Sequence, residues 1–172
     1  YCDPNTVGIY SVSYGLGSIA GLAYAPIFFV LLPATSAAWN VGKSAEVLEY
    51  FRFAQKYPFL LIVPGTLFLT SYAKQAIDII ATEAFAAPPV LIACIAAAIA
   101  IMNICAIAQI IFNVVDLPQR ILVIYIAAAA FNLLANTIAV PRFQAVGAAV
   151  ATLVTYIFQA VLTYLMSRSI LP

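Results

Sequence analysis

The sequence predicts an all-α fold, namely a polytopic helical membrane protein with about five transmembrane helices and one interfacial amphipathic helix. Of its 172 residues, 66% are hydrophobic and only 8% are charged, and the mean hydropathy is +1.09. A soluble domain carries roughly 25% charged residues, so this chain has too few charges to cover a water-facing surface. Its apolar runs are continuous rather than alternating, which favours spanning helices over the strands of a barrel.

The composition also excludes several classes of function. A net charge of +1 leaves no basic footprint, so no nucleic-acid partner is expected. The chain has no histidine, and Cys94 and Cys105 lie about 16 Å apart along one predicted helix, too far for a disulfide. No metal and no cofactor is therefore expected. Because no pair of carboxylates is placed together within the membrane, an enzyme is not expected either.

The first predicted span covers residues 7–32. Gly17 and Gly21 belong to a ladder of small residues along one face, next to Tyr10 and Tyr14, and are predicted to pack closely against another helix. The sequence also predicts that Pro26 kinks this helix and that Pro33 ends it.

Residues 35–57 form the one long polar interruption. Their charged residues are Lys43, Glu46, Glu49, Arg52 and Lys56. Apolar residues recur at helical spacing from Val47, and Ser44 is a candidate N-cap, so we expect an amphipathic helix in the membrane interface. The aromatic residues expected at headgroup level are Trp39, Tyr50 and Tyr57. The alternative is a plain solvated connector.

The second predicted span covers residues 58–81. Pro64-Gly65 predicts a kink or a local break. Lys74 and Asp78 lie four residues apart and can pair on one helix face. An ionisable residue inside a span is a functional candidate, but both lie near the end of the span, where a lysine can extend to the interface.

The remaining spans are predicted at 89–115, 119–140 and 145–166. The last two meet at a short hairpin, where Pro141-Arg142-Phe143 ends one apolar run and Gly147 opens the next. Polar residues at helical spacing give these two spans polar faces: Asn132 and Asn136 on the fourth, and Thr152, Thr155, Tyr156, Gln159 and Thr163 on the fifth.

The basic residues predict the orientation. With five spans, one side of the membrane collects Lys43, Arg52, Lys56, Arg120 and Arg168, and the other collects Lys74 and Arg142. The positive-inside bias then places Tyr1 outside and the C-terminus in the cytoplasm, in a multi-pass protein of the cytoplasmic (plasma) membrane.

Three stretches, taken in their order along the chain, carry a resemblance to a known family. They are Val7-Gly8-Ile9-Tyr10 with the later Ala25-Pro26 and Val30-Leu31-Leu32-Pro33-Ala34; the charged connector that leads into a proline-containing span with Ala73-Lys74; and Asn132-Leu-Leu-Ala-Asn136, Pro141-Arg142-Phe143 and Gly147-Ala-Ala-Val-Ala-Thr152. In these features the chain resembles the C-terminal portion of polysaccharide flippases, the O-antigen and lipid-linked oligosaccharide translocases of the multidrug/oligosaccharidyl-lipid/polysaccharide exporter superfamily. Family members commonly carry glycine directly after the aromatic residue of the hairpin, where this chain has Gln144.

The resemblance implies a transporter built from two lobes around a central cavity, which flips lipid-linked oligosaccharide or polysaccharide precursors across the cytoplasmic membrane by alternating access. It implies that residues 1–34 end the first lobe, that 35–57 form a cytoplasmic connector, and that 58–172 form the four-helix part of the second lobe. The partners would be the lipid bilayer, the lipid-linked saccharide and the remaining helices of the full-length transporter. Because the chain starts at Tyr1 and has an odd number of predicted spans, we expect a fragment.

The candidate substrate-path residues are Lys74, Asn103, Asn132, Asn136, Thr152, Tyr156 and Gln159. Neutral amides and hydroxyls suit a hydroxyl-rich sugar, and Lys74, the one basic residue placed within a span, suits a pyrophosphate headgroup. Arg52 and Lys56 are candidates at the cytoplasmic rim. For the amides and hydroxyls, the alternative is that they only bond neighbouring helices.

Two other functions stay open. A cation-coupled multidrug exporter of the same superfamily would need an acidic residue deep in a span, and Asp78 is the one candidate. A non-transporting membrane subunit would bind a partner through the face that carries Gly17 and Gly21. The upstream coding sequence would separate a fragment from a complete five-span protein.

Overall fold

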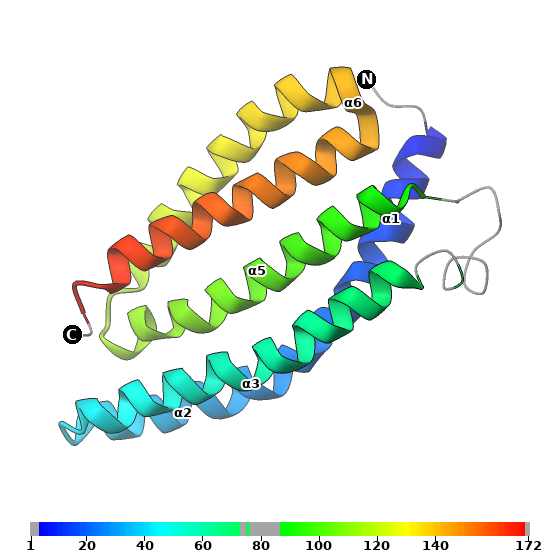
Figure 1. Cartoon of the computed structure of the whole chain (residues 1–172). Coiled ribbons are helices and arrows are strands. Elements are labelled where there is room, and N and C mark those ends of the chain that lie inside the picture. The colour runs from blue at the N-terminus through cyan, green and yellow to red at the C-terminus, as the bar shows by residue number, and fades with distance from the viewer. Residues whose placement is uncertain (1–3, 73–74, 76–86, 171–172) are drawn as a thin grey trace.

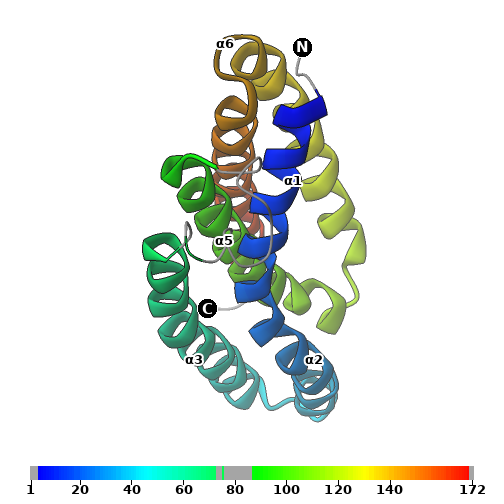
Figure 2. The ribbon, with the colours of Figure 1, turned by 90° about the vertical axis from the view of Figure 1, so that its right-hand side faces the viewer.

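The computed structural model describes residues 4–72, 75 and 87–170. Helix accounts for 92% of these described residues, and they contain no strand, so the all-α fold class is confirmed. The helices lie side by side in one bundle, with α5 in contact with α1, α2, α3 and α6 (Figures 1 and 2).

The N-terminal part is a long bent rod rather than one span with an end at Pro33. It consists of α1 (Pro4–Ile19), a 3₁₀ segment (Ala20–Tyr24) and α2 (Ala25–Asn40). The irregular segment ends two residues before Pro26. Proline disturbs the helix there because it lacks the N–H that would bond the carbonyl four residues earlier, and because its ring crowds that carbonyl. The predicted disturbance at Pro26 is confirmed.

The predicted helix end at Pro33 is wrong. Pro33 lies inside α2, which continues to Asn40. An interior proline costs about 3 kcal/mol, but the buried side chains of Leu31 and Ala38 belong to one hydrophobic cluster on either side of it. Continuous burial along this face outweighs the loss of one hydrogen bond.

The amphipathic connector and the second span are one helix, α3 (Ser44–Ser71). Its buried side chains Val47, Phe51 and Ile62 lie along one stripe, which explains why the helix continues through Pro58. A local break at Pro64-Gly65 is ruled out, because α3 is helical through both residues, and the alternative of a kink there stays a prediction. Helix α3 ends at Ser71, and residues 73–74 and 76–81 of the predicted span lie outside the described residues.

The start of α3 differs from the prediction as well. Gly42, with φ 75°, makes the turn from α2, as the absence of a Cβ permits. The N-cap position is Lys43 rather than Ser44, and it makes no side-chain capping hydrogen bond.

The C-terminal half consists of α5 (Pro89–Val114) and α6 (Pro118–Ser167). Helix α6 is interrupted at Gln144, which has the non-helical angles φ 48° and ψ −125°, and the chain reverses there into two antiparallel arms (Figure 1). We call residues 118–143 the first arm and residues 145–167 the second arm. The predicted hairpin is therefore confirmed.

Among the described residues, two helices are long and apolar enough to cross a membrane, namely α5 and α6, and Pro26–Asn40 is a shorter apolar helix. Each arm of α6 by itself exceeds the roughly 20 residues that a span needs. The division of the chain into two lobes at residues 34 and 57 stays a prediction.

The turns separate into two ends of the bundle. The turn between α2 and α3, the turn between α5 and α6, and the end of the second arm lie at one end (Figures 1 and 2). The start of α1, the end of α3 and the reversal at Gln144 lie toward the other.

Candidate functional site

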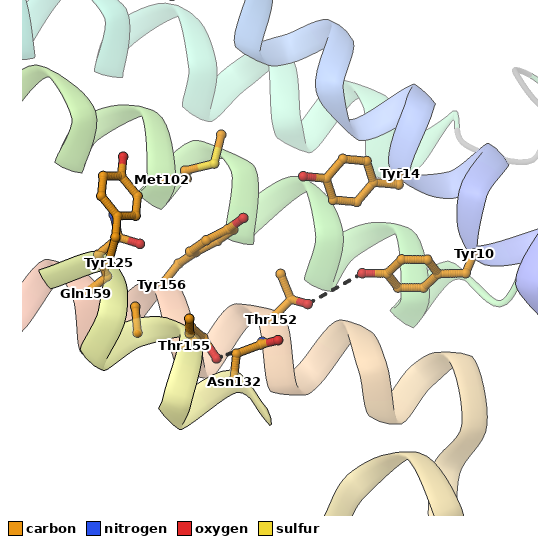
Figure 3. Close-up of a pocket in the computed structure, with 11 residues that line it drawn as sticks. Tyr10, Tyr14, Met102, Tyr125, Asn132, Thr152, Thr155, Tyr156 and Gln159 are labelled. Atoms are coloured by element: carbon orange, nitrogen blue, oxygen red, sulfur yellow. Dashed lines mark hydrogen bonds between the residues drawn. The ribbon is translucent and has the colours of Figure 1, made fainter. Parts of the chain in front are cut away.

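The candidate site is a cavity of about 330 Å³ between α1, α5 and the two arms of α6 (Figure 3). Its lining side chains are Tyr10, Tyr14, Met102, Tyr125, Ala128, Ala129, Asn132, Thr152, Thr155, Tyr156 and Gln159. The volume is at the lower end of the roughly 300–1,000 Å³ of small-ligand sites, so it suits one ring-sized group.

Helical periodicity explains how α6 supplies most of this lining. On the first arm, Tyr125 and Asn132 are seven residues apart and share a face. On the second arm, Thr152, Thr155 and Gln159 recur at spacings of three and four, which places them on the face toward the first arm and α5. The cavity therefore brings together four of the predicted path residues: Asn132, Thr152, Tyr156 and Gln159.

Hydrogen bonds tie the helices together around the cavity. The Asn132 Nδ2 donates to Thr155 Oγ1 at 3.0 Å and so joins the two arms. The Thr155 hydroxyl in turn donates to the carbonyl of Ala151 at 2.7 Å. The Tyr10 hydroxyl lies 3.4 Å from Thr152 Oγ1, the dashed contact of Figure 3, and joins α1 to the second arm. Part of the polar set thus bonds neighbouring helices.

Asn136 does not line the cavity. Its Nδ2 donates both to the backbone carbonyl and to the Oδ1 of Asn132, each at 2.9 Å. With its oxygen held by Asn136 and its nitrogen directed at Thr155, the Asn132 amide is fixed in orientation.

Unlike the amide nitrogen of Asn132, the amide nitrogen of Gln159 has no hydrogen-bond partner in the described part of the chain. The Gln159 side chain is 1% exposed, and this nitrogen is buried. The other buried glutamine, Gln109, donates from Nε2 to Thr163 Oγ1 at 3.0 Å. Buried polar groups in folded proteins are nearly always paired, so an unpaired amide on a cavity wall is a candidate ligand contact.

The tyrosines give the cavity its aromatic walls. The rings of Tyr14 and Tyr156 point toward one another across it, from α1 and from the second arm (Figure 3). Apart from the tyrosine hydroxyls, none of the lining side chains is ionisable at any accessible pH. Aromatic faces combined with neutral donors and acceptors can hold an uncharged polar ligand, and they offer no acid–base pair for catalysis.

The predicted packing glycines lie away from the cavity, against α5. A Cβ built on Gly17 would lie 2.9 Å from Ile95 Cγ2, and one on Gly21 would lie 3.0 Å from Asn103 Nδ2. Asn103, a predicted path residue, therefore faces the rod of α1 and α2, where its Nδ2 donates to the carbonyl of Ile99 at 2.9 Å. It does not line the cavity.

The predicted basic candidates are not brought to the cavity either. Arg52 and Lys56 are exposed on α3 and line hollows elsewhere on the surface. Lys74, together with Asp78, lies outside the described residues.

Lys43 and Glu46 form an exposed ion pair at the start of α3, with Nζ and Oε2 3.0 Å apart. The Tyr50 hydroxyl donates to Glu46 Oε1 at 2.9 Å. The hydrogen bonds from Lys43 and from Tyr50 lower the pKa of Glu46, and the same carboxylate raises the pKa of Lys43 and of Tyr50. The positive charge of Lys43 is thus balanced by the carboxylate of Glu46.

Sequence reasoning missed part of the lining. Tyr125 was recoverable, because it precedes Asn132 by two helical turns on an already recognised polar face. Tyr10 and Tyr14 were assigned to the face of Gly17 and Gly21, and only the bundle shows that the tyrosines reach past α5 to α6.

Comparison of the chain with protein-family models, with curated proteins and with solved structures finds no match. No group of three or more His, Cys, Asp or Glu side chains that could hold a metal ion occurs in the described part of the chain.

Proposed function

We propose that this chain is part of a multi-pass membrane transporter that flips lipid-linked oligosaccharide or polysaccharide precursors across the cytoplasmic membrane by alternating access. In this proposal the cavity between α1, α5 and α6 contacts the saccharide. The observation that carries it is the neutral, tyrosine-rich lining with an unpaired amide on Gln159.

The outer surface supports a location in the bilayer. Large apolar side chains are exposed on every major helix, for example Phe29 at 82%, Leu67 at 63% and Leu133 at 67%. A water-soluble monomer rarely exposes contiguous apolar surface on this scale, whereas a bilayer solvates it. The two arms of α6 and helix α5 have the length and composition of spans.

The described cations support the orientation with a cytoplasmic C-terminus. Lys43, Arg120 and Arg168 belong to the turns and helix ends that lie at one end of the bundle, whereas Arg142 lies beside the reversal at the opposite end. An excess of basic residues at one end is the pattern of cytoplasmic loops.

The lining favours a saccharide over the substrate of a cation-coupled exporter. A sugar presents hydroxyl groups on its edges and an apolar C–H face, which matches amides and hydroxyls set between tyrosine rings. None of the lining residues is acidic, so the cavity offers no carboxylate to a coupling cation.

A flipping assay tests the proposal. The complete protein is reconstituted in liposomes that contain a polyprenyl-pyrophosphate oligosaccharide with a fluorophore on the sugar, and a membrane-impermeant quencher reports which leaflet holds the label. We expect the quenched fraction to rise above that of protein-free liposomes. Loss of one hydrogen bond worth about 1.5 kcal/mol slows transfer about tenfold, which we expect for Gln159→Leu.

Tyr164→Phe is the matched control. Tyr164 lies on the same arm and is 67% exposed outside the cavity, so its hydroxyl should not affect transfer. If the wild-type protein moves no more labelled lipid than protein-free liposomes, the proposed function is wrong. If Gln159→Leu and Tyr164→Phe transfer at the same rate as the wild type, the cavity is not the sugar site.

A further inference from the structure

A second hollow region lies on the other side of α5, between α5 and α3. It consists of two adjoining hollows of about 530 Å³ and 250 Å³ that share Phe59 and Ile104. We call this region the α3–α5 groove. Its remaining lining residues are Arg52, Gln55, Lys56, Leu60, Ile62, Val63, Thr66, Leu67, Ala97, Ala100 and Ile101.

The groove is apolar along most of its length. On α5, Ala97, Ile101 and Ile104 lie along one face, turned away from the cavity that Met102 lines. On α3, the side chains of Leu60 and Leu67 are more than half exposed beside it. A groove with exposed apolar walls in a bilayer is filled by hydrocarbon.

One end of the groove carries two cations. Arg52 and Lys56 are one helical turn apart, and both line the larger hollow. Within the described part of the chain, the ion pairs within 4.0 Å include neither residue. Glu49 lines the adjacent surface hollow together with Arg52 and Lys56, so these three side chains carry one net positive charge. A cation beside lipid is costly unless it reaches the interface or meets an anion.

We propose that the α3–α5 groove binds an anionic glycerophospholipid of the bilayer. The headgroup phosphate lies between Arg52 and Lys56, and one acyl chain lies along the apolar walls toward Leu67. The guanidinium fork matches phosphate oxygens, and lysine adds a point charge. From Lys56 to Leu67 the helix advances about 16 Å, which accommodates most of an acyl chain. The proposal rests on the membrane location proposed above, but not on transport.

Lipid retention tests the site. The complete protein is purified in detergent, and native mass spectrometry measures its binding of phosphatidylglycerol and of phosphatidylcholine with the same acyl chains. Two interfacial cations correspond to a preference of roughly tenfold to thirtyfold for the anionic lipid. We expect Arg52→Ala/Lys56→Ala to abolish this preference, because phosphatidylglycerol binding should fall much more than binding of the zwitterionic phosphatidylcholine. Both residues are exposed, so the variant retains its packing.

Two controls remove a cation elsewhere. Lys43→Ala takes away a cation of the same helix that is already paired with Glu46, and Arg142→Ala takes away a cation at the hairpin of α6. Neither should change the preference. Ile104→Trp fills the junction of the two hollows and should weaken retention of both lipids, which separates the apolar wall from the charged mouth.

A competition with inorganic phosphate separates a lipid site from a site for free phosphate. We expect millimolar phosphate at constant ionic strength to leave phosphatidylglycerol bound. The proposal is wrong if the two lipids bind equally, if the double variant keeps the preference, or if inorganic phosphate displaces the lipid. Native mass spectrometry measures lipid binding alone. If the protein binds phosphatidylglycerol selectively but flips no saccharide, only the proposed transport function is wrong.

Discussion

Gln159→Leu is expected to stabilise the protein while it removes the unpaired donor of the cavity. The native side chain is 1% exposed, and its Nε2 finds no partner among the described residues. An unsatisfied buried polar group costs about 1–3 kcal/mol. Leucine has a comparable size and a similar helix propensity, so little else changes at this position. The free energy of unfolding should therefore rise by about 1–3 kcal/mol.

Gln109→Leu provides the matched comparison. Gln109 is also buried, at 3% exposed, but its Nε2 donates to Thr163 Oγ1 at 3.0 Å. Removing a satisfied hydrogen bond costs about 0.5–1.5 kcal/mol, so this variant should be less stable than the wild type. The same chemical substitution is thus expected to have opposite signs at two buried positions of one bundle.

Unfolding in mixed dodecylmaltoside–SDS micelles, followed by far-ultraviolet circular dichroism, measures both differences against the wild type. If Gln159→Leu lowers the unfolding free energy as much as Gln109→Leu does, the Gln159 amide is paired in the native protein and the predicted stabilisation is wrong. Stabilisation together with slowed saccharide transfer would mean that the protein keeps a destabilising group for its function.

Three further substitutions test the backbone and the helix contacts in the same unfolding assay. A Cβ on Gly147 would overlap the carbonyl oxygen of Ala139, so Gly147→Ala should lower the free energy of unfolding by about 1–3 kcal/mol or more. A Cβ on Gly15 meets nothing within 4 Å, so Gly15→Ala should raise the free energy of unfolding by up to about 1 kcal/mol. Equal effects would contradict the close approach of the arms. Gln144 has φ 48°, so Gln144→Gly should relieve strain and stabilise by about 1 kcal/mol, and a loss of stability would show that the conformation is unstrained. Gly17→Leu should destabilise by about 1–3 kcal/mol, because even a Cβ there lies 2.9 Å from an isoleucine methyl of α5, and an unchanged midpoint would refute the tight contact.

The hairpin and its polar face were predictable from local signals. A proline, an aromatic residue and a glycine follow one another between two apolar runs, and Asn132 and Gln159 lie on faces that helical periodicity alone defines. The backbone conformation at the reversal was not predictable from the residue itself, because glutamine does not favour a positive φ. The positive φ of that residue is the conformation that glycine adopts without cost.

The helix boundaries in the first half of the chain were not predictable in the same way. Pro33 and Pro58 read locally as an end and a start, but whether a helix continues through a proline depends on what its inner face buries on both sides. The stripe of Val47, Phe51 and Ile62 acquires that meaning only beside α5. Likewise, Gln109 and Gln159 look equivalent until the bundle shows that a threonine of another helix reaches only Gln109.

Helix α5 separates the two proposed sites, and this makes their tests independent. Met102 contributes to the polar cavity shared with α1 and α6, whereas Ile101 and Ile104 contribute to the apolar groove shared with α3. Successive residues of a helix are rotated by about 100°, so neighbours in the sequence face different sites. A substitution at Ile104 should therefore change lipid retention without entering the cavity, and one at Gln159 should change saccharide transfer without altering the groove. Because α3 contacts both α5 and α1, and both of these helices line the cavity, lipid bound in the groove could influence the cavity through a shift of either helix.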